Sequence, residues 1–154
     1  MIPNPRPMLE DFAHVATLSG FLVRDIEIRH EVLRAPHQPP ALPSASQAVY
    51  VFSLAREPGI VLKVGKVGAN SNARFQSQHY NPESAGSNLA KSLIERRDLW
   101  GQLGLEGEAA NNIGIWIREH TDRDHFFMTS DSNPLLLALL EVFLQCRLKP
   151  IFEG

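Results

Sequence analysis

Residues 48–67, AVYVFSLAREPGIVLKVGKV, are the stretch of sequence that decides the fold. Two runs rich in valine, leucine and aromatic residues, 48–54 and 60–66, flank the turn sequence Arg56-Glu57-Pro58-Gly59. Runs of this composition on either side of a proline-glycine turn are typical of two antiparallel strands. The sequence therefore predicts a β-hairpin near the centre of the chain.

Polar side chains that a hairpin does not need gather within it and just after it. The predicted strands carry Tyr50, Lys63 and Lys66, and a loop rich in glycine and asparagine then leads to Arg74 and His79. Lys63 lies between two apolar residues of a strand that reads as buried, where an ammonium group needs a polar cavity or an anion. Together the phenol, the two ammonium groups, the guanidinium and the imidazole suit the binding of a phosphate.

The segments on either side of the hairpin predict an α/β fold of the α+β kind. The expected elements are a helical region over 8–33, a proline-rich connector over 36–43, a helix from near Asn72, a helix from Ser87 or Asn88 to about Trp100, a strand over 112–118, a charged turn over 119–124, an extended piece over 125–130, and a last helix from Pro134 to about Arg147. We therefore expect a small, mostly antiparallel, three-stranded central sheet flanked by helices. Residues 1–46 are interpreted as an N-terminal helical arm with its connector, and residues 47–154 as the main domain.

Length and composition indicate one globular domain. The chain has 154 residues, of which 44% are hydrophobic and 21% are charged. The single cysteine, Cys146, excludes an internal disulfide and favours a reducing cytoplasmic location. The N-terminus has no apolar export signal. The longest apolar stretch, 135–146, is too short to span a bilayer, so we expect no membrane insertion.

Charge is distributed unevenly along the chain. The formal net charge is −2, which by itself argues weakly against a nucleic-acid partner. Residues 61–100 carry six basic and three acidic side chains, a net of +3, whereas residues 101–154 carry four basic and eight acidic side chains, a net of −4. A basic centre on an acidic body can still bind a polyanion locally.

Glu141 is the most informative single residue outside the hairpin. It lies in the predicted last helix, where leucine, valine and phenylalanine surround it on both sides. A helix that is apolar on nearly every face should be buried, and an ionised carboxylate there is costly without a compensating cation or donor. Glu141 either points into solvent at the margin of the helix, pairs with an arginine such as Arg147, or has a function.

The run 120–125, HTDRDH, is a second concentration of charged side chains. Its histidine and aspartate residues are types that bind metals. However, the run lies where a turn between strands is expected, and charged turns are ordinarily solvated. We therefore interpret it as a solvated turn and not as a metal site.

The order of these features resembles the GIY-YIG nuclease superfamily. Ala48-Val49-Tyr50 stands where the family has its GIY segment, and Leu62–Val67 stands where it has the YIG segment followed by a lysine. Lys63 replaces the second tyrosine, a change shared by some restriction-type members. Arg74 and Glu141 stand on the helix after the second strand and on the late helix, as the arginine and the carboxylate of the family do.

The resemblance extends to the residues after the arginine and to the end of the chain. His79 or Tyr80 matches the family's residue downstream of the arginine, although Gln78 occupies the usual spacing. The closing sequence Pro150-Ile-Phe-Glu153 resembles the final motif of the family, with Glu153 in place of an asparagine. The matched region covers residues 47–154.

The resemblance implies a metal-dependent DNA endonuclease, that is, a phosphodiester hydrolase that uses one divalent ion. Glu141 would hold Mg²⁺ or Mn²⁺, which binds the scissile phosphate and stabilises the leaving oxygen. Arg74 would hold a non-bridging phosphate oxygen. Tyr50 would orient or deprotonate the attacking water, helped by Lys63, and His79 would complete the catalytic set.

The resemblance also implies a DNA-binding surface around that centre. The residues expected to contact nucleic acid are Gly65, Lys66, Gln78, Tyr80, Lys91, Arg96 and Arg97. For Arg96 and Arg97 a plain solvated helix face is an equal alternative. A second hypothesis is a catalytically impaired module of the same kind, which binds nucleic acid or a protein partner. The N-terminal arm is a candidate for homodimer formation.

Overall fold

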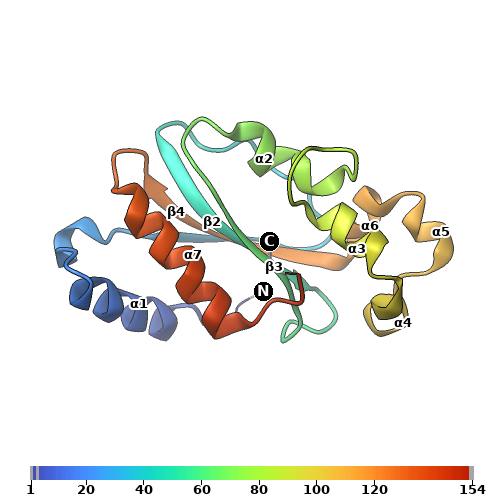
Figure 1. Cartoon of the computed structure of the whole chain (residues 1–154), viewed down its shortest axis with the longest axis horizontal. Coiled ribbons are helices and arrows are strands. Elements are labelled where there is room, and N and C mark those ends of the chain that lie inside the picture. Colours follow the sequence, from blue (N-terminus) through green and yellow to red (C-terminus); the bar gives the residue numbers. More distant parts are fainter. Residues whose placement is uncertain (1, 3, 153–154) are drawn as a thin grey trace.

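The protein consists of helices packed on both faces of one antiparallel sheet. The computed structural model describes residue 2 and residues 4–152. In this part of the chain seven α-helices flank a four-stranded sheet with the order β1-β4-β2-β3 (Figure 1). Of the helices in these ranges, none combines the length and the apolar character that crossing a membrane requires.

The predicted hairpin is confirmed as strands β2 (Ser46–Leu54) and β3 (Val61–Val67). The two strands are antiparallel, with Tyr50 opposite Gly65 and Phe52 opposite Lys63. Directly opposed residues point to the same face of a sheet, so Lys63 and the Tyr50–Gly65 pair share one face. Lys66 lies opposite Val49 and therefore points to the other face.

A fourth strand, β4 (Thr121–Thr129), replaces the predicted charged turn over 119–124. It pairs with β2 on one side and with β1 on the other, so it lies inside the sheet. The prediction of a solvated turn was wrong, because the charged side chains of this segment are enclosed by both neighbouring strands and by helices. Arg123 and Asp124 are both 0% exposed.

The N-terminal region contains a strand that the sequence pattern did not reveal. Helix α1 (Arg6–Leu18) ends before Gly20, whose φ of 95° is a left-handed conformation that favours glycine. The chain then forms the edge strand β1 (Arg29–Leu33). The predicted helical region over 8–33 was therefore wrong beyond residue 18, and the sheet has four strands instead of three.

The predicted strand over 112–118 is instead helix α6 (Ile113–His120). Three isoleucines alternate with other residues in this segment, which is why it resembled a strand. The buried residues are Ile113, Trp116 and Ile117, a spacing typical of one helix face, while Ile115 is half exposed. The buried residues of this segment therefore follow the period of a helix and not the two-residue alternation of a strand.

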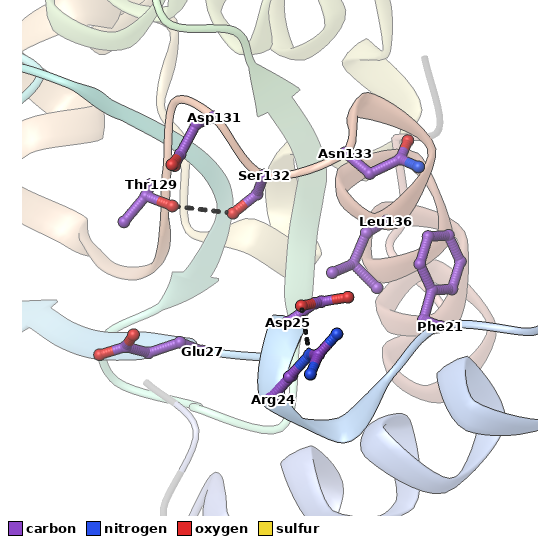
Figure 2. A pocket seen from close by; sticks show the side chains of 9 residues that line it. All are labelled: Phe21, Arg24, Asp25, Glu27, Thr129, Asp131, Ser132, Asn133 and Leu136. Atoms are coloured by element: carbon purple, nitrogen blue, oxygen red, sulfur yellow. Dashed lines mark hydrogen bonds and ion pairs between the residues drawn. The ribbon is translucent and has the colours of Figure 1, made fainter.

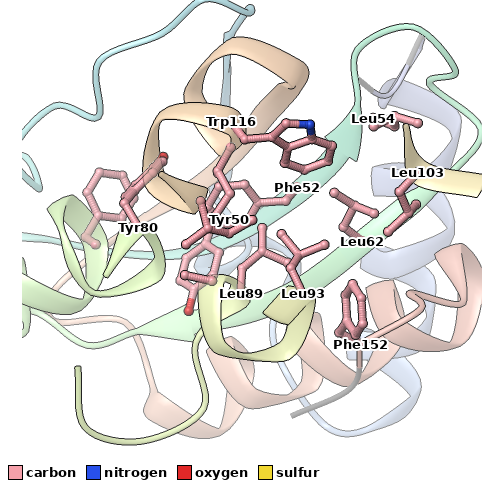
Figure 3. Packing of buried hydrophobic residues seen from close by; sticks show 14 of the residues in the cluster. Tyr50, Phe52, Leu54, Leu62, Tyr80, Leu89, Leu93, Leu103, Trp116 and Phe152 are labelled. Carbon is pink, nitrogen blue, oxygen red and sulfur yellow. The ribbon is translucent and has the colours of Figure 1, made fainter. Parts of the chain in front are cut away.

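Two sets of helices cover the two faces of the sheet (Figure 1). Helix α7 (Pro134–Leu148) packs with α1 on the face that carries Val49 and Val51. The opposite face, which carries Tyr50 and Phe52, is covered by α2 (Asn72–Gln76), α3 (Leu89–Glu95), α6, α4 (Trp100–Leu103) and α5 (Gly107–Ala110). Figure 3 shows this second core between the sheet and the helices.

Side-chain caps set the beginnings of two helices at the predicted positions. Asn88 Oδ1 accepts a hydrogen bond from the backbone N–H of Lys91 at the start of α3, and Asn133 Oδ1 accepts one from Leu135 at the start of α7. Helix α3 ends at Glu95 rather than near Trp100. Helix α7 extends across the sheet, which brings Glu141 to the edge strand β3.

Candidate functional site

Tyr50 is the centre of a buried polar cluster on the α3 face of the sheet. Its side chain is 0% exposed, and its hydroxyl oxygen lies 2.5 Å from His79 Nε2 and 3.3 Å from Arg74 Nε. Helix α2 carries Arg74, and the turn that follows it carries His79. These three residues, predicted to act together, are in direct contact.

The hydrogen bonds of His79 show which of its two ring nitrogens carries the proton. The backbone N–H of Leu89 donates to His79 Nδ1 at 3.2 Å. Burial, with Arg123, Lys63 and Arg74 nearby, holds the pKa of His79 well below its usual value, so the ring is neutral. A neutral imidazole that accepts at Nδ1 carries its proton on Nε2. His79 therefore donates to the Tyr50 oxygen.

The Tyr50 oxygen consequently accepts two hydrogen bonds, one from His79 and one from Arg74. Burial raises the pKa of the Tyr50 phenol above its ordinary value, while the positive charges of Arg74 and Arg123 oppose that rise. Two donors and two nearby cations favour a negative charge on this oxygen. The phenol is therefore protonated in the resting protein but surrounded by groups that stabilise its anion.

Gly65 provides the space in which Tyr50 lies. A Cβ atom at Gly65 would be 2.6 Å from the Tyr50 hydroxyl oxygen and 2.8 Å from Cζ. Gly65 was expected to contact nucleic acid. The structure shows a different use, because the Tyr50 ring itself fills the space.

Lys63 is buried beside this cluster, and its hydrogen-bond partner is Ser87 rather than Tyr50. Its side chain is 1% exposed, and Nζ donates to Ser87 Oγ at 2.9 Å. Burial and the neighbouring Arg74 lower the pKa of Lys63, while Glu141 raises it. The lysine therefore reaches the hydroxyl of the loop before α3, a partner that the sequence did not indicate.

Glu141 lies on the other side of the edge strand β3 and pairs with Lys66. The carboxylate accepts a hydrogen bond from Lys66 Nζ, and its side chain is 13% exposed. The partner predicted among the arginines, Arg147, pairs instead with Asp11 at 2.8 Å. Glu141 is thus neither free in solvent nor paired with an arginine.

A groove joins the two sides of the site. Its volume is about 730 Å³, and Lys66, Arg74 and Glu141 all line it, together with the small residues 68, 69 and 71 of the loop after β3. Arg74 therefore faces two environments, since its Nε contacts Tyr50 while its side chain borders the groove. Tyr50 and Lys63 lie behind the groove wall.

Arg123 is a member of this cluster that sequence reasoning missed. Its guanidinium carbon is 5.0 Å from the centroid of the Tyr50 ring, and Nη1 donates to Tyr80 Oη at 3.4 Å. The segment was interpreted as a turn because of its charges. The signal that would have found it is the alternation of Arg123, His125 and Phe127, which places all three on the Tyr50 face of β4.

The remaining predicted nucleic-acid contacts lie in different surroundings. Tyr80 is 6% exposed, and its hydroxyl contacts His37 Nε2 at 2.9 Å, so it belongs to the core. Gln78 donates to the backbone carbonyl of Ala85. The basic residues near α3 are exposed and have local partners: Lys91 with Glu95, Arg96 with Asp98, and Arg97 over the Trp100 ring.

A second hollow lies between the N-terminal region and the loop before α7 (Figure 2). Its volume is about 400 Å³, and Asp25, Glu27 and Asp131 contribute carboxylates to its lining. Arg24 lies 3.8 Å from Asp25, and Thr129 is hydrogen-bonded to Ser132. The three carboxylates point apart in Figure 2, so this hollow does not form a ligand cage.

The described residues contain no ready-made cluster of metal-ligating side chains. Within residue 2 and residues 4–152, no group of three or more histidine, cysteine, aspartate or glutamate side chains is arranged to hold a metal ion. Glu153, which stands where the resemblance has an asparagine, lies outside the described residues.

Comparisons with known proteins do not assign the chain to a family. A scan against protein-family models and searches of curated proteins and of solved structures gave no match. The geometry of the groove and of the buried cluster is therefore the basis for the functional argument.

Replacing Gly65 tests whether Tyr50 depends on the space above β3. Gly65→Ala should lower the free energy of unfolding by about 1–3 kcal/mol, because the new methyl group and the buried phenol compete for one volume. Gly59→Ala is the matched control, since a Cβ there meets nothing within 4 Å. Urea unfolding measures both, and equal stability of the two variants would contradict the packing described here.

Acid sensitivity provides a second test, through His37. Burial, with Arg123 nearby, lowers the pKa of His37 from 6.5 to about 4. Between these two values the unfolded chain binds a proton that the folded chain does not, so stability falls as the pH falls. His37→Gln should remove roughly 1.4 kcal/mol per pH unit of that loss.

The measurement is a series of urea unfolding curves between pH 7 and about pH 4, compared across variants. His14→Gln serves as the control because His14 is exposed on α1. An unchanged pH dependence in His37→Gln would mean that His37 accepts its proton in the folded protein.

Proposed function

We propose that this chain is a metal-dependent DNA endonuclease of the GIY-YIG type. The observation that supports the proposal is one groove bordered by a carboxylate, an ammonium and a guanidinium, from Glu141, Lys66 and Arg74, with the phenol of Tyr50 directly behind the guanidinium. These are the groups that hydrolysis of a phosphodiester requires: a metal ligand, phosphate-binding cations and a group that handles the proton of water.

Glu141 suits a magnesium or manganese ion as a single protein ligand. Magnesium prefers hard oxygen ligands and keeps several waters, so one carboxylate at the wall of an open groove meets its needs. When bound, the ion would polarise the scissile phosphate and stabilise the leaving oxygen. Lys66 pairs with this carboxylate, and it would have to move aside for an ion.

Each of the two cations at the groove contacts a group with a role in the proposed reaction, either the metal ligand or the phenol. Lys66 pairs with Glu141, and Arg74 donates to the Tyr50 oxygen. A DNA phosphate in the groove attracts both cations, because charge-assisted hydrogen bonds to phosphate are strong. Their movement toward the phosphate would free Glu141 for the metal and open the Tyr50 hydroxyl to water. Substrate binding would thus assemble the site.

Tyr50 would then act on the attacking water. Once Arg74 has turned to the phosphate, His79 still donates to the phenol oxygen and keeps it oriented. The phenol would first release its proton to solvent. The phenolate would then accept a proton from the attacking water as the water oxygen bonds to phosphorus, which regenerates the phenol. Lys63, held by Ser87, adds positive charge nearby.

The proposed DNA surface extends from the groove over its basic surroundings. Lys66 and Arg74 contact phosphates at the centre, while Lys91, Arg96 and Arg97 are exposed near α3 and suit contacts that do not read sequence. Tyr80 and Gly65 are omitted from this surface because both are buried. A cytoplasmic setting accords with an enzyme that acts on DNA.

A second candidate function is binding without catalysis. The ion pair between Lys66 and Glu141 favours it, since a lysine that stays on the carboxylate replaces the metal. Binding of labelled DNA in the presence of EDTA, with no cleavage in Mg²⁺ or Mn²⁺, would support such a module and contradict the nuclease.

Glu141→Gln tests the role of the carboxylate while keeping its shape. We expect Mg²⁺-dependent cleavage of plasmid and of single-stranded DNA to fall by about 1,000-fold or more, because several kcal/mol of transition-state stabilisation are lost. Glu108→Gln, an exposed carboxylate on α5, should cleave at the wild-type rate. Full activity in folded Glu141→Gln would refute the metal-binding assignment.

Arg74 is tested by removal and by conservative replacement. Arg74→Ala should reduce turnover by about 100- to 1,000-fold because a donor to the developing charge is lost, and Arg74→Lys should recover part of it. The matched control is Arg6→Ala, an exposed arginine on α1. Single-turnover cleavage of a labelled oligonucleotide measures the rates, and a wild-type rate in Arg74→Ala would remove the phosphate-binding role.

A further inference from the structure

Arg123 is a fully buried cation enclosed by aromatic rings. It lies on β4 and is 0% exposed. Its guanidinium carbon is 4.4 Å from the centroid of the Phe75 ring, and 5.0 Å from the centroids of both Phe52 and Tyr50. These rings come from α2 and β2, so the cation lies between the sheet and the helix that carries Arg74.

No carboxylate of the described residues forms an ion pair with this guanidinium, and its Nε and Nη2 atoms have no hydrogen-bond partner there. The neighbouring acids point to the opposite face of the sheet. Asp124 lies 2.8 Å from His30, and Asp122 accepts a hydrogen bond from the backbone of Ala35. Among the described residues, aromatic rings and the Tyr80 hydroxyl are thus the groups in contact with the buried positive charge of Arg123.

Such a group weakens a fold. Burying an unpaired charge is unfavourable, and an apolar side chain of similar length commonly fills such a space with equal or greater stability. Packing alone therefore does not explain an arginine at this position. Buried charges of this kind concentrate at functional sites, where their field acts on a reacting group.

We propose that Arg123 is a positioning residue that holds a permanent positive charge against Tyr50 and stabilises its phenolate form. The inference rests on the proposed function, in which Tyr50 loses its proton to solvent before it accepts one from water. The cation lies over the ring, where the negative charge of a phenolate is partly delocalised. The attraction between cation and ring is therefore stronger for the phenolate than for the phenol.

Arg123 and Arg74 have different roles in this arrangement. Arg74 borders the groove and leaves the Tyr50 oxygen when it binds a phosphate. Arg123 does not line the groove and is packed against three aromatic rings, so its charge remains beside Tyr50 when Arg74 departs. The phenolate is thus stabilised at the step in which it is exposed to water.

Other groups also act on the phenol, and the test must separate them from Arg123. The remaining charged or titratable neighbours are Arg74 on α2, His79 on the turn after it, Lys63 and Lys66 on β3, His125 opposite Tyr50 on β4, and Glu141 on α7. These side chains all stay in place when Arg123 alone is replaced. Arg123 also lowers the pKa of His79 and of His125, so the same titration follows these two imidazoles as well as the phenol.

Fluorine NMR of protein labelled with a fluorinated tyrosine provides a direct test that does not depend on cleavage. The chain has two tyrosines, so two resonances are expected, and Tyr80→Phe assigns them. Fluorination lowers the phenol pKa into an accessible range. The pKa of residue 50 is measured in the wild-type sequence, in Arg123→Met and in Arg123→Lys.

We expect Arg123→Met to raise the pKa of Tyr50 by about one pH unit or more, and Arg123→Lys to raise it by less because the charge is retained. Arg118→Met is the matched control. Its guanidinium lies 5.1 Å from the Tyr80 ring, so its removal should shift Tyr80 and leave Tyr50 unchanged. Arg123→Gln replaces Arg123→Met if the latter does not fold.

An unchanged Tyr50 pKa in a folded neutral variant would overturn the proposal. Failure of all three variants to fold would assign Arg123 a structural role and overturn it as well. In a cleavage assay the pH profile of Arg123→Met should move toward alkaline pH by the same amount. If the wild-type protein cleaves no DNA, the proposed function fails, whereas the titration still decides whether Arg123 acts on Tyr50.

Discussion

The Tyr50 ring lies across the backbone of Gly65, and the rest of the site is arranged around this cross-strand pair. Any side chain at residue 65 would occupy the volume of the phenol, so the register of the hairpin and the position of the phenol are linked. His79 and Arg74 reach the phenol oxygen from one side of the sheet. A shift of the hairpin by one residue would move Tyr50 to the α7 face and separate it from both partners.

Positive charge is the second organising feature of the site. Arg74 and Lys66 border the groove and are held by Tyr50 and Glu141, whereas Lys63 and Arg123 are buried behind it. The hydrogen-bond partners of the buried pair are neutral hydroxyl groups, from Ser87 for Lys63 and from Tyr80 for Arg123. This arrangement favours an anion at the groove and a negative charge on Tyr50. The proposed nuclease function uses both consequences, since the phosphate is the anion and the phenolate is the base.

Local sequence patterns are informative where the physical signal lies within a few residues of the element that it predicts. The hairpin, the short helix that carries Arg74 and the capped last helix were predictable because turn residues and caps act within a few positions. The errors arose where two readings of one pattern compete. Residues 113–120 alternate like a strand but bury a helical face, and residues 121–129 carry charges typical of a turn but form a strand inside the sheet.

The sequence by itself determined the hairpin, the capped last helix and the set of polar side chains that the hairpin does not require. Tyr50, Lys63 and Glu141 were identifiable because such groups are unfavourable in apolar segments unless something compensates them. Arg74 and His79 were identified by their position after the hairpin in the family resemblance. Only the tertiary structure decided their partners. Lys66 forms an ion pair with Glu141, Lys63 donates a hydrogen bond to Ser87, and the guanidinium of Arg123 lies over the Tyr50 ring. Each of these contacts joins segments far apart in the chain, and their distances follow from strand order and helix packing, which no short stretch of sequence encodes.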